Sequence, residues 1–188
     1  MTTRLEVRPR HRPELDPEFV PAALWCRAFD ATVKAAGGGE PLAIALERPN
    51  GNVSVHHARI LPHRGPEREI NLRYVERLVK FLLWMKGGYK ITICGDPELA
   101  KALAAIYCPN GARAFDQQIM GERVFWRPFT VEHRPAGEVP AERETQMALG
   151  GHFDGCRIGF DLGGSDRKCA AVQDGKVLFT EEVVWDPY

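Results

Sequence analysis

Apolar residues at helical spacing mark three segments in the first part of the chain. Residues 21–36 carry apolar side chains three and four positions apart, which predicts a helix with one buried face. Residues 70–86 carry too many apolar side chains for a surface helix, so we expect this helix to be largely buried. A third helix is predicted from Asp96 to about Tyr107, because an aspartate followed by Pro97 favours a helix start.

Strand-like segments lie between and after these helices. Residues 42–61 predict a hairpin with its turn at residues 49–52, where Asn50-Gly51 is a strong turn signal. Residues 89–94 predict a buried strand, and residues 124–131 predict a strand whose proline confines it to a sheet edge or a bulge. Short links between helices and strands favour an α/β fold, with a mixed sheet and helices packed on it.

The end of the chain predicts a three-strand antiparallel meander. The first strand spans 156–162, the second spans about 167–173 and the third spans 176–185. The dipeptide Asp174-Gly175 is a strong two-residue hairpin signal between the last two strands.

Composition shifts along the chain predict four parts. Proline and charge alternate at the start, where Leu5 and Val7 could add a short edge strand, and polar residues with several prolines and glycines precede the meander. The expected parts are an irregular arm at 1–20, an α/β region at 21–131, a linker at 132–151 and a terminal unit at 152–188.

Charge and length narrow the classes of partner. The 188 residues include 25 Lys+Arg and 25 Asp+Glu, so broad electrostatic capture of nucleic acid or of an anionic membrane is not expected. No apolar run reaches the roughly 20 residues that span a bilayer, and the N-terminus lacks the features of a signal peptide. The five cysteines contain no CxxC pair, which favours reduced thiols. We therefore expect a cytoplasmic protein.

The turn after the first meander strand carries the candidate chemistry. Strand alternation places Asp161 on the same face as two glycines, where a ligand can approach closely. Gly163 and Gly164 predict a turn that a Cβ would hinder, and their amides with Ser165 can donate to phosphate oxygens. A carboxylate beside phosphates makes sense when Mg²⁺ lies between them, so Asp161 predicts a metal–nucleotide complex.

The run Ile-Gly-Phe-Asp-Leu-Gly-Gly-Ser, with the later Ala-Ala-Val and Asp-Gly-Lys-Val-Leu, resembles the first phosphate loop and opening strands of the ROK family. This family of bacterial sugar kinases and related repressors belongs to the actin-like ATPase superfamily, whose lobes have a ribonuclease H-like fold. The resemblance implies that residues 152–188 begin a nucleotide-binding lobe that uses ATP and Mg²⁺. It also implies that Asp161 faces the Mg²⁺, directly or through water, and that Gly163, Gly164 and Ser165 contact the terminal phosphates. Lys168 would reach the same anion.

The resemblance covers only the end of the chain. The family's catalytic base, second phosphate loop and adenosine-binding segment would lie downstream, so catalytic residues are not assigned. Asp166 departs from the family pattern by adding negative charge beside the phosphates. Because one hairpin loop cannot position two substrates for phosphoryl transfer, we expect an N-terminal fragment of a sugar kinase-like protein, inactive by itself, which binds nucleotide and whose parent phosphorylates a sugar.

Two other interpretations remain open from the sequence. In the first, the glycine turn is purely structural, and all strands join one sheet in a non-catalytic binding or interaction module. In the second, Trp84, Tyr89 and Tyr107 recognise a sugar or a partner, although their spacing is more typical of core residues. A meander without its covering helix leaves an apolar face and open edges, so we expect self-association or poor solubility unless the first 150 residues cover it.

Overall fold

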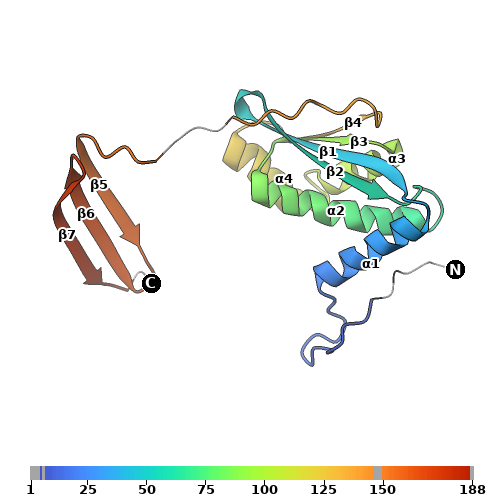
Figure 1. The fold of residues 1–188 in the computed structure, drawn as a ribbon, viewed down its shortest axis with the longest axis horizontal. Helices are drawn as coiled ribbons and strands as arrows, with labels where there is room; N and C mark the ends of the chain where they lie inside the picture. The colour runs from blue at the N-terminus through green and yellow to red at the C-terminus, as the bar shows by residue number, and fades with distance from the viewer. Residues whose placement is uncertain (1–4, 6, 146–149, 187–188) are drawn as a thin grey trace. The chain divides into compact units, whose positions relative to one another are not determined.

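In this computed structural model, the described residues are 5, 7–145 and 150–186, and they belong to two compact units, Met1–Thr145 and Gln146–Tyr188. The first unit is an α/β layer with a mixed four-stranded sheet, and the second is a three-stranded antiparallel sheet (Figure 1). The predicted α/β class with packed helices and a terminal meander is therefore confirmed. The two sheets are separate, so the alternative in which the hairpin at 42–61, the strand at 89–94 and the meander join one sheet is wrong.

The helices and strands follow the predicted order, except that residues 114–125 form α4 and a π-helical segment that the sequence does not predict. The elements of the first unit are α1 (Ala22–Ala35), β1 (Glu40–Arg48), β2 (Asn52–Ile60), α2 (Glu67–Lys86), β3 (Lys90–Cys94), α3 (Pro97–Ile106), α4 (Ala114–Gln118), a π-helical segment (Ile119–Phe125) and β4 (Thr130–Arg134).

Local signals account for the main turns of this unit. Asn50 and Gly51 both adopt left-handed backbone conformations, with φ of 64° and 69°, between β1 and β2. The Asp96 side chain accepts a hydrogen bond from the Leu99 amide at 2.9 Å and so caps α3. Asp96 thus acts as a helix cap, as its position before Pro97 predicts.

The sheet has the strand order β2-β1-β3-β4. β1 pairs antiparallel with both β2 and β3, whereas β3 and β4 are parallel and joined through α3. The apolar positions Ile44 and Ile93 lie opposite each other in neighbouring strands, and both are fully buried. They belong to one core with the inward faces of α1, α2 and α3, where Phe29 and Tyr74 stack with ring centroids 4.1 Å apart.

The structure of residues 124–131 differs from the strand that the sequence predicts. Ile119–Phe125 is π-helical, and β4 begins only at Thr130. Phe125 packs edge-on against Tyr89, with ring centroids 6.1 Å apart. This packing stabilises helical backbone at Phe125, an aromatic residue whose own preference favours a strand. The proline before β4 precedes an edge strand, as expected from its missing N–H.

The predicted linker at 132–151 is also shorter than expected. Residues 132–134 complete β4, and residues 135–145, here called the strap, return to the opposite edge of the sheet. There Arg143 and Val53 exchange backbone hydrogen bonds of 2.7 and 2.9 Å. The chain therefore belongs to the first unit as far as Thr145.

Glu144 attaches the strap to the end of the β1–β2 hairpin and to α2. Its carboxylate accepts hydrogen bonds from the Ser54 hydroxyl at 2.5 Å and the Lys86 ammonium at 2.8 Å, and the Arg48 guanidinium lies at 3.4 Å. The bonds from Lys86 and Ser54 and the nearby positive charges lower the pKa of Glu144 to about 2. A single carboxylate thus joins three elements.

Glu144→Gln is expected to lower stability at neutral pH. Because the folded pKa is depressed, the carboxylate stabilises the fold above the unfolded pKa of about 4.3 and loses this contribution as the pH falls toward 2. The urea midpoints of the parent and variant should therefore differ at pH 7 and approach each other below about pH 4.5. Glu138→Gln, an exposed strap position, is the control, and an equal effect of both variants would contradict the role of Glu144.

The N-terminal arm has no regular secondary structure in its described part, residues 5 and 7–20. Leu5 and Val7 form no edge strand and instead pack against the core. No helix among the described residues is long and apolar enough to cross a membrane. The five cysteines are free thiols, of which Cys94 is buried and Cys156 is exposed.

The second unit consists of β5 (Cys156–Leu162), β6 (Asp166–Gln173) and β7 (Lys176–Val184), in that order across the sheet. Asp174 and Gly175 form the predicted turn with φ of 49° and 79°. The Asp174 carboxylate also accepts the Gly155 amide at 2.7 Å, which ties the start of the unit to this turn.

Candidate functional site

The register of the meander places polar residues together on one face. Asp161 pairs with Lys168 across β5 and β6, and Lys168 pairs with Glu182 across β6 and β7. The neighbouring row on the same face is Gly159, Ala170 and Thr180. Small side chains in this second row leave the backbone accessible beside the charged row.

These two rows line a shallow hollow of about 450 Å³, together with Phe160, Cys169 and Glu181 from the row between them. Gly159 contributes open backbone to it, because a Cβ at this position would meet nothing within 4 Å. The hollow therefore has small residues at one end and the charged row of Asp161, Lys168 and Glu182 at the other.

The opposite face of the meander is mainly apolar, although it also carries Arg167 and Glu181. Ile158, Phe160 and Phe179 are 70%, 72% and 52% exposed, and the register places them on the face away from Asp161. Strands β5 and β7 are the outer strands of the sheet. These features agree with the sequence argument for self-association, which stays a prediction.

The turn between β5 and β6 differs from the expected glycine turn. Neither Gly163 nor Gly164 has a positive φ, so the prediction that this turn needs conformations restricted to glycine is wrong. Because Leu162 pairs with Arg167, the loop has four residues, and loops of this length commonly use ordinary turn conformations. A Cβ at Gly163 would instead be a tight fit, since it would lie 3.0 Å from the Asp166 carbonyl oxygen.

Trp185 fixes the same turn from the third strand. Its backbone amide donates to the Ser165 carbonyl at 3.2 Å, and its indole N–H donates to the Gly163 carbonyl at 2.8 Å. These two bonds engage carbonyl oxygens of the turn. The Gly164 backbone has open space around it, because an added Cβ would meet nothing within 4 Å.

The carboxylate of Asp166 lies inside this turn. It accepts a hydrogen bond from Lys168 at 2.8 Å, and the Ser165 hydroxyl donates to it at 3.4 Å. The bond from Lys168 is the main cause that lowers the pKa of Asp166, and the same bond raises the pKa of Lys168. Two of the predicted phosphate donors therefore already contact an anion of the chain itself.

Asp161 has a different environment. Its side chain is exposed, and within residues 5, 7–145 and 150–186 no hydrogen bond or ion pair engages its carboxylate. Lys168 faces it across the strands, and its negative charge helps to raise the pKa of Lys168. A carboxylate in this state can take a hydrated cation without breaking an existing contact.

All five predicted site residues thus lie at one end of one hairpin, but they do not form one donor set. Ser165 and Lys168 are directed to Asp166, Gly163 is packed against Asp166, and Gly164 and Asp161 are open. In the described part of the chain, no group of three or more His, Cys, Asp or Glu side chains could hold a metal ion. Any metal here would need ligands from a bound nucleotide or from water.

Glu182, Thr180 and Trp185 are neighbours of the site that sequence reasoning did not select. The cross-strand register supplies the missing signal, because it fixes which residues of the third strand share a face with Asp161. Period 2 along a single strand gives the faces but not the register between strands.

The aromatic residues considered for sugar recognition do not form one surface. Tyr107 is 3% exposed, and its hydroxyl donates to the Glu76 carbonyl at 3.3 Å. Trp84 is half exposed and donates to the buried Asp116 at 2.6 Å. The Tyr89 hydroxyl donates to Glu47 at 2.9 Å, so all three side chains have structural partners.

No known family model, curated protein or solved structure matches this chain.

Proposed function

We propose that residues 152–188 form the first phosphate loop and opening strands of a nucleotide-binding lobe similar to that of the ROK sugar kinases. In this proposal the lobe has an actin-like ATPase fold, and the complete protein transfers the γ-phosphoryl group of ATP to a sugar. The chain described here contributes nucleotide binding rather than turnover.

The open carboxylate of Asp161 carries the proposal. A meander that served only as a scaffold would not require an exposed acid next to Gly159 and an open hollow. Mg²⁺ bound to a triphosphate keeps several waters, and in this proposal Asp161 would contact one of them or the ion itself. Magnesium would supply charge neutralisation there, and Gly164 would donate its amide to phosphate oxygen.

The contacts of Asp166 oppose a tight site. For Lys168 and Ser165 to donate to phosphate, the Asp166 carboxylate has to leave the turn. The proposal therefore predicts weak Mg·ATP binding by the parent chain, improved when this carboxylate is removed.

Calorimetry with Mg·ATP on the full chain tests the proposal. Asp161→Asn is expected to weaken binding by about tenfold or more, because it removes a charge-assisted contact to the hydrated ion. Asp154→Asn is the matched control, because it makes the same chemical change at an exposed acid of the same unit that does not line the hollow. Equal affinity in the parent and the Asp161 variant would contradict the proposal.

The arrangement of Asp166 also favours a second candidate, a non-catalytic module whose turn is structural. Asp166→Asn separates the two candidates. The nucleotide proposal predicts tighter Mg·ATP binding, because Lys168 and Ser165 are released. The module predicts no Mg·ATP binding in either protein and only a loss of stability on urea unfolding.

A further inference from the structure

The connection between β2 and α2 contains a buried histidine. His63 lies in its residues 62–66, here called the 62–66 loop, and its side chain is only 4% exposed. The other five histidines of the chain are half-buried or exposed. Protonation of a buried ring adds a charge that water cannot solvate, and histidine is the side chain that titrates near neutral pH. The surroundings of His63 therefore decide how this loop responds to acid.

Asn71 of α2 determines which state of the ring fits the fold. The Leu61 amide donates to Asn71 Oδ1 at 3.1 Å, and Asn71 Nδ2 donates to the Leu61 carbonyl at 2.8 Å. These two bonds fix the orientation of the side-chain amide, so that Nδ2 lies 3.4 Å from His63 Nδ1. The NH₂ group is a donor and can pair only with an unprotonated Nδ1. Asn71 thus selects the neutral ring with its proton on Nε2.

Protonation of His63 would set two donors against each other, because an Nδ1–H group would point at the Asn71 NH₂ group. Asn71 cannot turn its oxygen to the ring without breaking both bonds to Leu61, which is buried. The loop is held less firmly, by a bond of 3.2 Å from the exposed Arg68 guanidinium to the His63 carbonyl, which water can replace. The charged ring is therefore expected to leave Asn71, and the loop to move with it.

Charged groups of three neighbouring elements also face the ring. Burial is the largest influence and lowers the pKa of His63. The acids act in the opposite direction, and they are Asp96 and Glu98 at the start of α3 and Glu40 at the start of β1. Asp96 is the nearest, with Oδ1 3.9 Å from His63 Nε2, which is beyond hydrogen-bond distance. Arg68 of α2 lowers the pKa further, so the net direction is down.

We propose that His63 is an acid-sensitive latch, whose neutral ring holds the 62–66 loop on Asn71 and whose protonation releases the loop. The latch opens on acidification, because the pKa of His63 in the closed state lies below the unfolded value of about 6.5. The closed loop keeps its full stability above that value and loses it as the pH falls through the pKa of the closed state. The bonds between Leu61 and Asn71 do not involve the ring, so the release is local.

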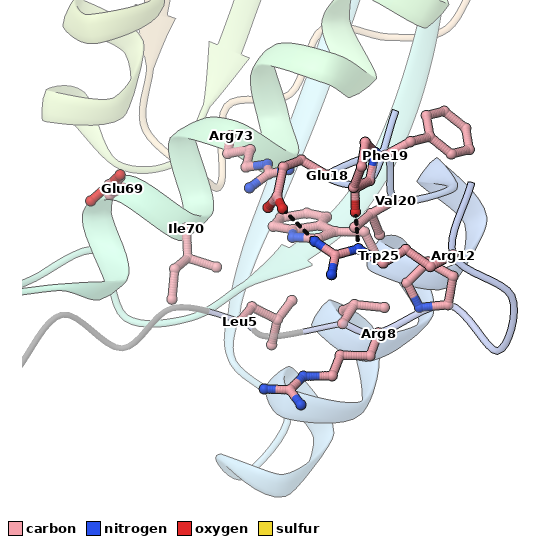
Figure 2. Close-up of a pocket in the computed structure, with 13 residues that line it drawn as sticks. Leu5, Arg8, Arg12, Glu18, Phe19, Val20, Trp25, Glu69, Ile70 and Arg73 are labelled. Atoms are coloured by element: carbon pink, nitrogen blue, oxygen red, sulfur yellow. Dashed lines mark hydrogen bonds and ion pairs between the residues drawn. The ribbon is translucent and has the colours of Figure 1, made fainter. Parts of the chain in front are cut away.

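An internal reference lies on the same helix. Ile70 directly precedes Asn71 and lines a pocket beside the N-terminal arm, together with Leu5 and Trp25 (Figure 2). The described residues that line this pocket include no histidine. The latch therefore predicts that the Trp25 signals stay unchanged between about pH 8 and pH 5, while the 62–66 loop responds.

NMR of the ¹³C- and ¹⁵N-labelled full-length chain, from about pH 8 to pH 5, tests the latch. The His63 ring should titrate at lower pH than the four exposed histidines, His11, His57, His133 and His152. As it does so, the backbone order parameters of Arg64 and Gly65 should fall from about 0.85 to below about 0.6. Titration of His63 together with the exposed histidines, unchanged order parameters, or a simultaneous change of the Trp25 signals would each overturn the proposal.

The Asn71→Asp variant tests the selection of the neutral ring. It keeps the side-chain size but puts an oxygen opposite His63 Nδ1, where it can accept from the protonated ring. His63 should then titrate at higher pH than in the parent, and the loop should stay ordered at about pH 5. His57→Gln, at an exposed position of the same unit, is the control and should leave the His63 titration unchanged. An Asn71→Asp chain in which His63 titrates as in the parent contradicts the latch, and if this variant does not fold, the parent's titration and order parameters decide.

Discussion

Replacing Asn71 with leucine is expected to lower the free energy of unfolding by about 3 kcal/mol. Asn71 is fully buried on α2, where its side chain accepts the Leu61 amide at 3.1 Å and donates to the Leu61 carbonyl at 2.8 Å. Leucine has the same number of side-chain heavy atoms and the same branching, but it leaves both backbone groups of Leu61 buried without partners. The His63 ring, 3.4 Å from the Asn71 amide nitrogen, loses a contact as well.

Urea unfolding followed by far-ultraviolet circular dichroism measures this loss. The helical signal reports on the first unit, because the described part of the second unit contains strands and no helix. Asn110→Leu makes the same chemical change at an exposed position and should shift stability by less than about 0.5 kcal/mol. An Asn71 variant as stable as the parent would show that the paired bonds to Leu61 contribute nothing.

Replacing Gly39 with alanine is expected to destabilise the first unit by about 3 kcal/mol, and Gly37→Ala by only about 1 kcal/mol. Both glycines follow α1 with positive φ, 64° at Gly39 and 87° at Gly37. An alanine Cβ at position 39 would collide with the Ile60 carbonyl oxygen and lie 2.7 Å from Val33 Cγ1. At position 37 it would meet nothing within 4 Å.

The difference between these two variants separates steric contact from backbone strain. Each alanine carries the cost of a left-handed conformation, but only Gly39→Ala adds overlap with a neighbouring strand and helix. Midpoints from thermal and urea unfolding should rank the proteins as parent, Gly37→Ala and Gly39→Ala. Equal losses would mean that β2 moves aside at no cost.

The sequence was most informative where a turn depends on its own residues. Asn50-Gly51 and Asp174-Gly175 predicted two hairpins because few residues other than glycine, asparagine and aspartate adopt left-handed backbone readily. The cap at Asp96 is equally local. These features need no knowledge of distant parts of the chain.

The errors arose where distant contacts decide the local structure. Phe125 lies in a π-helical turn because it packs on Tyr89, which precedes it by many residues. The strap resembles a linker in composition, yet Arg143 pairs with Val53 at the edge of the sheet. Neither partner can be identified from the periodicity of the segment itself.

The candidate phosphate turn lies between these two cases. Sequence reasoning grouped its five residues correctly on one hairpin and noted the added charge of Asp166. It could not predict that the Asp166 carboxylate would accept hydrogen bonds from Ser165 and Lys168, because these bonds depend on side-chain conformation in a four-residue loop.

The strap has a mechanical consequence for the whole chain. Residues 135–145 leave β4 and are fastened to β2, through the Arg143–Val53 bonds and through Glu144, before the backbone continues to the C-terminal unit. A pulling force applied at the C-terminal side would act first on the contacts between the strap and β2. The force would reach β4, which directly precedes the strap in the chain, only after those contacts had broken.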